Sequence, residues 1–329
     1  MRSFAGISVG CALLTFGLNA CIATTDVGGD GDVAVVEQAL GGYTAIKDFN
    51  SNGDHRIKIG PTYTVFHRPG AGCSIVEVVR TVTGESLQVP QLPGCPRITN
   101  MLSESIVLVV DAASGYIYQL GTNFIYDWIP LVDTGAAYVE DLAINDTDIF
   151  WYDGYWLSKT SRTTLKTSRG PGYRGYLIDV DGSDLYVQNA LGGQNYELAK
   201  YTWSGNNVTF SSLARFTSWV GLGYTADANY IYWAQNADTS AIRRVSKAGS
   251  AIVDVKTSTS VMYYAPVSTG SALYWLEETR STRATSIRRK NLVNGNVTSS
   301  SFPFLTSELN VFSDGLYFSY GDTLYRTSR

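Results

Sequence analysis

The feature that most constrains the fold is a short apolar and aromatic run that recurs seven times. Successive copies lie about 42 residues apart, a period typical of solenoids and propellers. Units of this length bury their apolar faces only against neighbouring units, so the sequence predicts a repeat architecture. The copies are anchored at Val65, Val107, Ile149, Leu185, Ile231, Leu273 and Leu316.

Each unit reads as a small antiparallel sheet. A polar turn such as Asp227–Asn229 precedes the run Ile231–Trp233, and a third strand is predicted at Ala241–Val245. Alternating apolar and polar residues favour strands, and no run continues at helical period for three turns. The sequence therefore predicts an all-β fold, a seven-bladed β-propeller of four-stranded antiparallel blades over residues 41–329.

The last unit is too short for a complete blade, since residues 309–329 hold only three predicted strands. An unpaired outer edge would invite association with other chains. Residues 43–49 are placed to supply the missing outer strand. We expect this N-terminal strand to close the last blade.

The Ile231–Trp233 and Leu273–Trp275 runs, each followed by a basic third strand, resemble the YWTD-like and NHL-like families of extracytoplasmic propellers. The resemblance extends over about 290 residues and rests on a loose motif. It implies an architecture and says little about activity.

The N-terminal segment reads as an export signal. Residues 1–20 have one basic residue and an apolar stretch too short to span a membrane, as in a signal peptide. The sequence Leu18-Asn19-Ala20-Cys21 resembles a bacterial lipobox, which would lipidate Cys21 and anchor the protein in the outer membrane. Ordinary cleavage near Ala20 or Ala23 would instead give a secreted protein. Residues 21–40, small and acidic, are expected to form a tether.

Besides Cys11 in the leader and the lipidation candidate Cys21, the chain has two cysteines, Cys73 and Cys95. An exported pair of this kind is expected to form a disulfide. The bridge would close a loop of about 23 residues and contribute roughly 3 kcal/mol of stability.

Composition excludes several functions. The formal net charge of −4 gives no electrostatic basis for binding nucleic acid. The chain has only two histidines, His55 and His67, and lacks the G-x-S-x-G, H-E-x-x-H and P-loop motifs. Propellers that resemble virginiamycin B lyase use a histidine near a metal, and no histidine follows His67.

Residues 48–54 match the first half of a calcium loop, in which alternating oxygens face one centre. They also resemble the core of FG-GAP-type propeller repeats. Arg56 and Ile59 stand where that loop expects acidic residues, which removes negative charge. Either a weak calcium site or a simple turn is consistent with the pattern. The ligand candidates are Asp48, Asn50, Asn52 and Asp54.

Polar residues recur two positions after the third residue of the repeated runs. Equivalent positions in a propeller lie near one face, so these side chains are candidates for a ligand-binding ring. The alternative is that strands simply end at polar residues. The ring candidates are Asp111, Asp153, Asn189, Gln235, Glu277 and Tyr320.

Basic residues cluster on the predicted third strands of two units, at 243–247 and 280–290. A solvated outer face explains them, and a phosphate or polysaccharide contact is the alternative. Together these features favour a monomeric, non-enzymatic cell-envelope lipoprotein that binds a protein or glycan, with no cofactor and no membrane contact beyond its lipid. The alternatives are a carbohydrate-active enzyme using carboxylates such as Asp111, Asp153 and Glu277, and a calcium-dependent adhesin.

Overall fold

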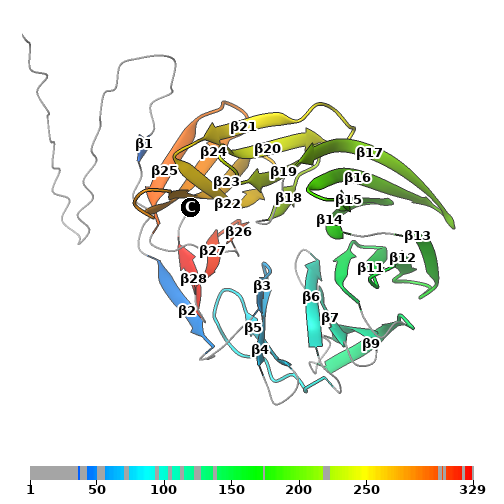
Figure 1. The fold of residues 1–329 in the computed structure, drawn as a ribbon. Helices are drawn as coiled ribbons and strands as arrows, with labels where there is room; N and C mark the ends of the chain where they lie inside the picture. The colour runs from blue at the N-terminus through cyan, green and yellow to red at the C-terminus, as the bar shows by residue number, and fades with distance from the viewer. Residues whose placement is uncertain are drawn as a thin grey trace, which may run out of the picture.

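The computed structural model describes residues 36–37, 43–49, 56–69, 74–92, 96–102, 106–111, 115–121, 127–135, 139–172, 175–217, 223–302, 306, 309–320 and 323–327. Every regular element in these ranges is a β-strand. No helix there is long and apolar enough to cross a membrane. The sheets are arranged in a ring around a central axis, which confirms the predicted all-β propeller (Figure 1).

Six sheets are blades of four antiparallel strands. Three of these blades are formed by strands between residues 96 and 217. They contain β6 (Pro96–Leu102), β7 (Ile106–Asp111), β8 (Tyr116–Gly121) and β9 (Asp127–Asp133); β10 (Asp141–Ile144), β11 (Asp148–Tyr152), β12 (Trp156–Ser161) and β13 (Thr167–Gly172); and β14 (Gly175–Asp181), β15 (Asp184–Gly192), β16 (Asn195–Ser204) and β17 (Asn207–Thr217).

The other three blades complete this set. They contain β18 (Tyr224–Ala226), β19 (Tyr230–Gln235), β20 (Ser240–Ser246) and β21 (Val253–Ser258); β22 (Val261–Ser268), β23 (Ala272–Thr279), β24 (Thr285–Asn291) and β25 (Val297–Ser301); and β26 (Leu309–Phe312), β27 (Gly315–Tyr320), β28 (Thr323–Thr327) and β2 (Thr44–Asp48). A two-residue strand, β1 (Val36–Glu37), lies parallel to β25 at the edge of its blade.

The prediction of seven four-stranded blades is wrong, because the described residues form only six sheets with four antiparallel strands. The remaining sheet has three, β3 (Arg56–Ile59), β4 (Tyr63–Pro69) and β5 (Ser74–Arg80). After β5 the chain makes one isolated bridge, between Val79 and Ser86. Pro90 follows; a proline has no N–H to give to a sheet. Its carbonyl instead accepts the indole N–H of Trp128 at 2.8 Å. The segment therefore packs on the next blade instead of adding a fourth strand.

The N-terminal strand closes the ring. β2 pairs antiparallel with β28, with Thr44 opposite Arg326 and Asp48 opposite Thr323. In Figure 1 the blue β2 lies directly beside the red β28. This agrees with the prediction from the short last unit, whose three strands also begin within two residues of their expected positions.

The repeated aromatic runs form the second strand of each blade and fill the spaces between blades. Trp151, Trp233 and Trp275 are almost completely buried, as are the residues on both sides of them. Both faces of such a strand are covered because each sheet packs between two neighbours. Burying each large apolar side chain contributes roughly 1.5–3 kcal/mol, so these runs are primarily structural.

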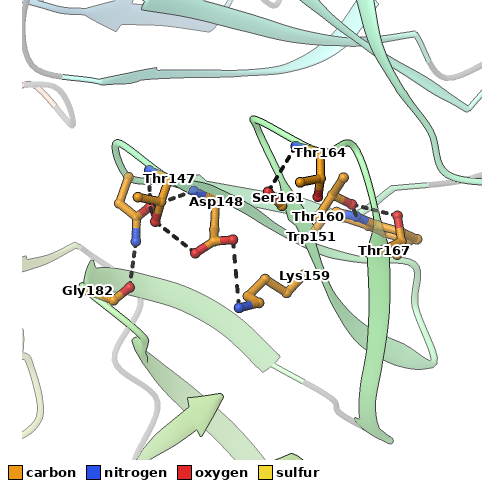
Figure 2. Close-up of polar contacts among 10 residues, drawn as sticks. Thr147, Asp148, Trp151, Lys159, Thr160, Ser161, Thr164, Thr167 and Gly182 are labelled. Atoms are coloured by element: carbon orange, nitrogen blue, oxygen red, sulfur yellow. Dashed lines mark hydrogen bonds and ion pairs between the residues drawn. The ribbon is translucent and has the colours of Figure 1, made fainter. Parts of the chain in front are cut away.

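Polar turns connect neighbouring blades as well as neighbouring strands. The side-chain oxygen of Asn145 accepts the N–H groups of Thr147 and Asp148 at 2.9 and 2.8 Å, and its amide donates to Gly182 of the next blade at 2.6 Å. Asp148 also pairs with Lys159 at 3.7 Å. Figure 2 shows this turn and its contact with Gly182. Asn, Asp and Gly are favoured here because their side chains or backbone freedom satisfy tight turns.

Candidate functional site

The propeller has two distinct faces. The turns between second and third strands and the connections between blades share one, which we call the crossover face. Arg280, between β23 and β24, donates its backbone N–H to Ser260, between β21 and β22, at 2.9 Å. The remaining turns form the hairpin face. The six predicted ring residues all lie at or near the crossover end of a second strand.

Asp153 stabilises its own turn. Its Oδ1 accepts the backbone N–H groups of Tyr155 at 2.9 Å and Trp156 at 2.6 Å. This is the Asx-turn arrangement that favours Asp at such positions. The carboxylate is therefore engaged by its own chain.

Glu277 and Gln235 occupy equivalent positions in adjacent blades and are both buried. Glu277 accepts the indole N–H of Trp275 at 3.0 Å and the guanidinium of Arg288 at 2.8 Å. Gln235 accepts from Arg243 at 2.7 Å and donates to the carbonyl of Thr217 at 3.1 Å. Both side chains are held between strands.

Asn189 belongs to a third such network, in the blade β14–β17. It hydrogen-bonds to Glu197, whose carboxylate also accepts from Ser212 at 2.7 Å and Arg215 at 2.9 Å. Burial alone would raise the pKa of Glu197, but these donors hold it below its usual value. Glu197 was not predicted; its position directly opposite Asn189 in the sheet is the signal that marks it.

The last two ring candidates differ from these. Tyr320 ends β27 with about half of its surface exposed. Asp111 ends β7, and its side chain lies outside the described residues. The hydrogen bonds of Asp153, Asn189, Gln235 and Glu277 given above thus lie mainly within their own blades.

The basic third strands have two separate roles. In the sequence Ile287-Arg288-Arg289, Arg288 pairs with Glu277 on one face of the sheet, and Arg289 donates to the hydroxyl of Tyr274 at 3.0 Å on the other. Arg243 and Arg244 of β20 repeat the pattern. The expectation of a merely solvated face is incomplete for these arginines, because alternation along a strand sends neighbouring side chains to opposite faces.

Large apolar side chains are exposed on the crossover face of two adjacent blades. Tyr155 is 77% exposed and Trp156 is 43% exposed, at the turn between β11 and β12. Tyr176, at the start of β14, is 56% exposed, and Leu191 near the end of β15 is 49% exposed. The guanidinium of Arg169 lies 5.7 Å from the Trp156 ring. We call Tyr155, Trp156, Tyr176 and Leu191 the aromatic patch; it was not predicted, because most aromatics in the repeats are core residues.

Asp141, at the start of the innermost strand β10, is a mostly buried acid on the crossover side of the ring. Its carboxylate accepts the backbone N–H groups of Leu142 and of Leu177 in the next blade, both at 2.8 Å. Burial raises its pKa to about 6, although these hydrogen bonds and the charge of Lys58 act in the opposite direction. Asp141 was not predicted. In the sequence, only the acidic pair Glu140-Asp141 directly before an apolar strand marks this position.

This raised pKa predicts a pH-dependent stability. The unfolded carboxyl titrates near pH 4, so the folded state loses relative stability as the pH rises from about 4 to 6. The full effect is up to about 3 kcal/mol. In Asp141→Asn the group cannot ionise. We therefore expect the unfolding free energy of the wild type minus that of the variant to fall by about 2–3 kcal/mol between pH 4 and 7. Urea unfolding at several pH values measures this; a constant difference contradicts it.

The predicted calcium ligands are only partly described. Asp48 ends β2, opposite Thr323, and Asn50, Asn52 and Asp54 lie outside the described residues. Within the described ranges, no three His, Cys, Asp or Glu side chains gather as a metal site. Calcium binding at this loop stays a prediction.

Lipidation and a disulfide are predicted at three cysteines. Cys21, Cys73 and Cys95 lie outside the described residues, as does the signal sequence. Both modifications stay predictions.

The blades and the ring closure define a β-propeller. The chain is similar to virginiamycin B lyase from Staphylococcus aureus, with a TM-score of 0.58 and 13% identity over 88% of this chain and 99% of that one. It is similar to the Pan2 WD40 domain of Neurospora crassa, with a TM-score of 0.57 and 9% identity over 87% and 95% of the chains. It is also similar to BamB from Moraxella catarrhalis, with a TM-score of 0.50 and 13% identity over 97% and 95%. Identities this low establish the shared fold alone.

No family model matches the chain. No curated protein matches its sequence.

Proposed function

We propose that this protein is a non-enzymatic binding module of the bacterial cell envelope, which binds a glycan or a protein at the aromatic patch. It acts as a monomer, held to the outer membrane by lipid on Cys21. One observation carries the proposal. The ring candidates Asp153, Gln235 and Glu277 bond within the protein. On the same crossover face, Tyr155, Trp156 and Tyr176 are exposed. Aromatic rings with a polar tip are well suited to contact sugars and peptides.

The engaged carboxylates argue against glycoside hydrolysis. That reaction needs two carboxyl groups facing one bond, about 5–10 Å apart. Asp153 is used by its own turn, and Glu277 is buried against Arg288 in a different blade. A histidine-to-alanine variant of the Staphylococcus aureus lyase is catalytically inactive. The histidines of this chain are His55 and His67, and His67 is buried within β4.

The proposal predicts that the aromatic patch can be removed without unfolding the protein. We expect Trp156→Ser combined with Tyr176→Ser to change the unfolding free energy by less than about 1 kcal/mol, because both side chains are substantially exposed. Binding should weaken by at least about tenfold. Thermal unfolding of the mature domain with a panel of oligosaccharides, and capture of partners on immobilised protein, measure both effects.

The matched control is Phe210→Ser, which removes an equally exposed aromatic side chain from the outer strand β17. A ligand that binds the wild type and this control but not the double variant supports the proposal. Equal binding by all three proteins would place the ligand elsewhere. Turnover of a bound oligosaccharide would favour the carbohydrate-active alternative.

A further inference from the structure

Three cations gather where the blade β18–β21 meets the blade β22–β25. They are Arg244 on β20, Lys256 on β21 and Lys290 on β24. We call them the basic cluster. The two blades are neighbours in the ring (Figure 1). The cluster is separate from the aromatic patch, which belongs to the blades β10–β13 and β14–β17.

The backbone fixes the positions of these side chains. Lys256 lies opposite Ile242 and therefore on the same face of the sheet as Arg244, two residues further along β20. A register shift follows directly at Arg243. From the adjacent blade, Lys290 donates to the carbonyl of Val255 at 3.4 Å. This contact brings its ammonium group next to Lys256.

An aromatic ring packs against the guanidinium of Arg244. Its guanidinium lies 4.4 Å from the centre of the Tyr230 ring. In the described part of the chain its Nε is buried without a hydrogen-bond partner. Tyr232, the residue directly opposite Arg244, gives its hydroxyl proton to Asp227 at 2.9 Å, and its oxygen accepts a hydrogen bond from the Arg244 guanidinium. The cation is thus held in place and retains donor capacity.

No carboxylate neutralises the basic cluster within the described residues. The nearby arginine Arg243 pairs with Asp254 at 2.9 Å, but Arg244, Lys256 and Lys290 form no ion pair there. Burial and the charges of Arg244 and Lys256 lower the pKa of Lys290 below its usual value, with no acidic group opposing them. Three cations held together repel one another, and an anion between them would relieve that repulsion.

We propose that Arg244, Lys256 and Lys290 form a binding site for a phosphate or a similar oxyanion. A guanidinium offers a planar set of donors to such a group, and the two ammonium groups add charge and further donors. The ligand is either a soluble phosphate compound or the headgroup of an anionic lipid. This site is independent of the function proposed for the aromatic patch.

The test is a titration of the mature domain with inorganic phosphate at low ionic strength. We expect Lys256→Gln to weaken phosphate binding by about tenfold. The side chain of Lys256 is exposed, so its loss should leave the fold intact. The matched control is Lys166→Gln, which removes an exposed lysine from a loop of another blade and should bind phosphate like the wild type.

A second readout follows Lys290 itself. Phosphate should raise the pKa of the Lys290 ammonium toward its ordinary value, as measured by NMR titration, because a bound anion favours the charged form. In Lys256→Gln the same pKa should rise even without phosphate. A Lys290 pKa unmoved by both phosphate and the substitution would overturn the proposal, as would equal phosphate affinity in the wild type and Lys256→Gln.

Vesicles distinguish the two sources of the oxyanion. Binding to phosphatidylglycerol vesicles but not to phosphatidylcholine vesicles, lost in Lys256→Gln, assigns the site to a lipid headgroup. Phosphate binding that depends on Lys256 without vesicle binding assigns it to a soluble phosphate. An unlipidated Cys21→Ser protein serves for these measurements, so that the lipid anchor does not contribute.

Discussion

Glu277→Ala should lower the free energy of unfolding by about 3 kcal/mol. The substitution leaves the guanidinium of Arg288 without its buried carboxylate and the indole N–H of Trp275 without an acceptor. Removing one member of a buried pair is costly, because the other member remains away from water. Urea unfolding followed by tryptophan fluorescence and circular dichroism measures the loss.

The adjacent blade supplies the control. Glu277→Gln recreates the arrangement of Gln235, whose oxygen accepts from Arg243 at 2.7 Å. This variant should lose only about 1 kcal/mol, because an acceptor for Arg288 remains. Equal losses in the alanine and glutamine variants would mean that charge, and not the hydrogen bond, stabilises this position. A negligible loss in both would contradict the role assigned to the pair.

Phe49→Ala should lower the free energy of unfolding by about 3–4 kcal/mol. Phe49 directly follows the closing strand β2, and its buried ring stacks on Phe66 of the three-stranded sheet, with centroids 4.2 Å apart. The side chain therefore joins the last blade to the first sheet. Removing this side chain leaves a cavity between the last blade and the first sheet, where the propeller closes.

Tyr43→Ala is the matched control, because Tyr43 directly precedes β2 just as Phe49 directly follows it. Its ring is about half exposed and meets Tyr325 edge-on, with centroids 5.9 Å apart. We expect a loss of less than about 1 kcal/mol. If both substitutions lower the free energy of unfolding equally, closure of the propeller depends on the pairing of β2 with β28 and not on the buried side chain of Phe49.

The repeat pattern predicts the strands well because their burial is local in the sequence. Each aromatic run such as Ile231–Trp233 is covered on both faces, which makes it continuous and easy to recognise. The closing strand could also be inferred, since residues 309–329 are too few for four strands. The missing fourth strand after β5 depends on one proline and on a contact with Trp128 in the next blade. The repeat spacing carries no information about a single contact of this kind between blades.

The predicted ring illustrates a different limit. Equivalent positions in a repeat do share a face, as Asp153 and Glu277 do. Whether a side chain there is available to a ligand depends on its partners, such as Arg288, which come from other strands. The exposure of Trp156 and Tyr176 could not be distinguished from core burial by residue type alone. The sequence shows which residue types a face carries. The neighbours on adjacent strands determine whether those side chains can contact a ligand.

The pairing of β2 with β28 also has a consequence for how the protein folds. Thr44 and Arg326 are opposite one another although about 280 residues separate them, the longest loop closure in the described sheets. Hairpins within a blade need only short loops and should form early. The joint between β2 and β28 should form late, because non-local pairing slows folding. Until then two strand edges stay open, so the nascent protein is most vulnerable to aggregation just before its ring closes.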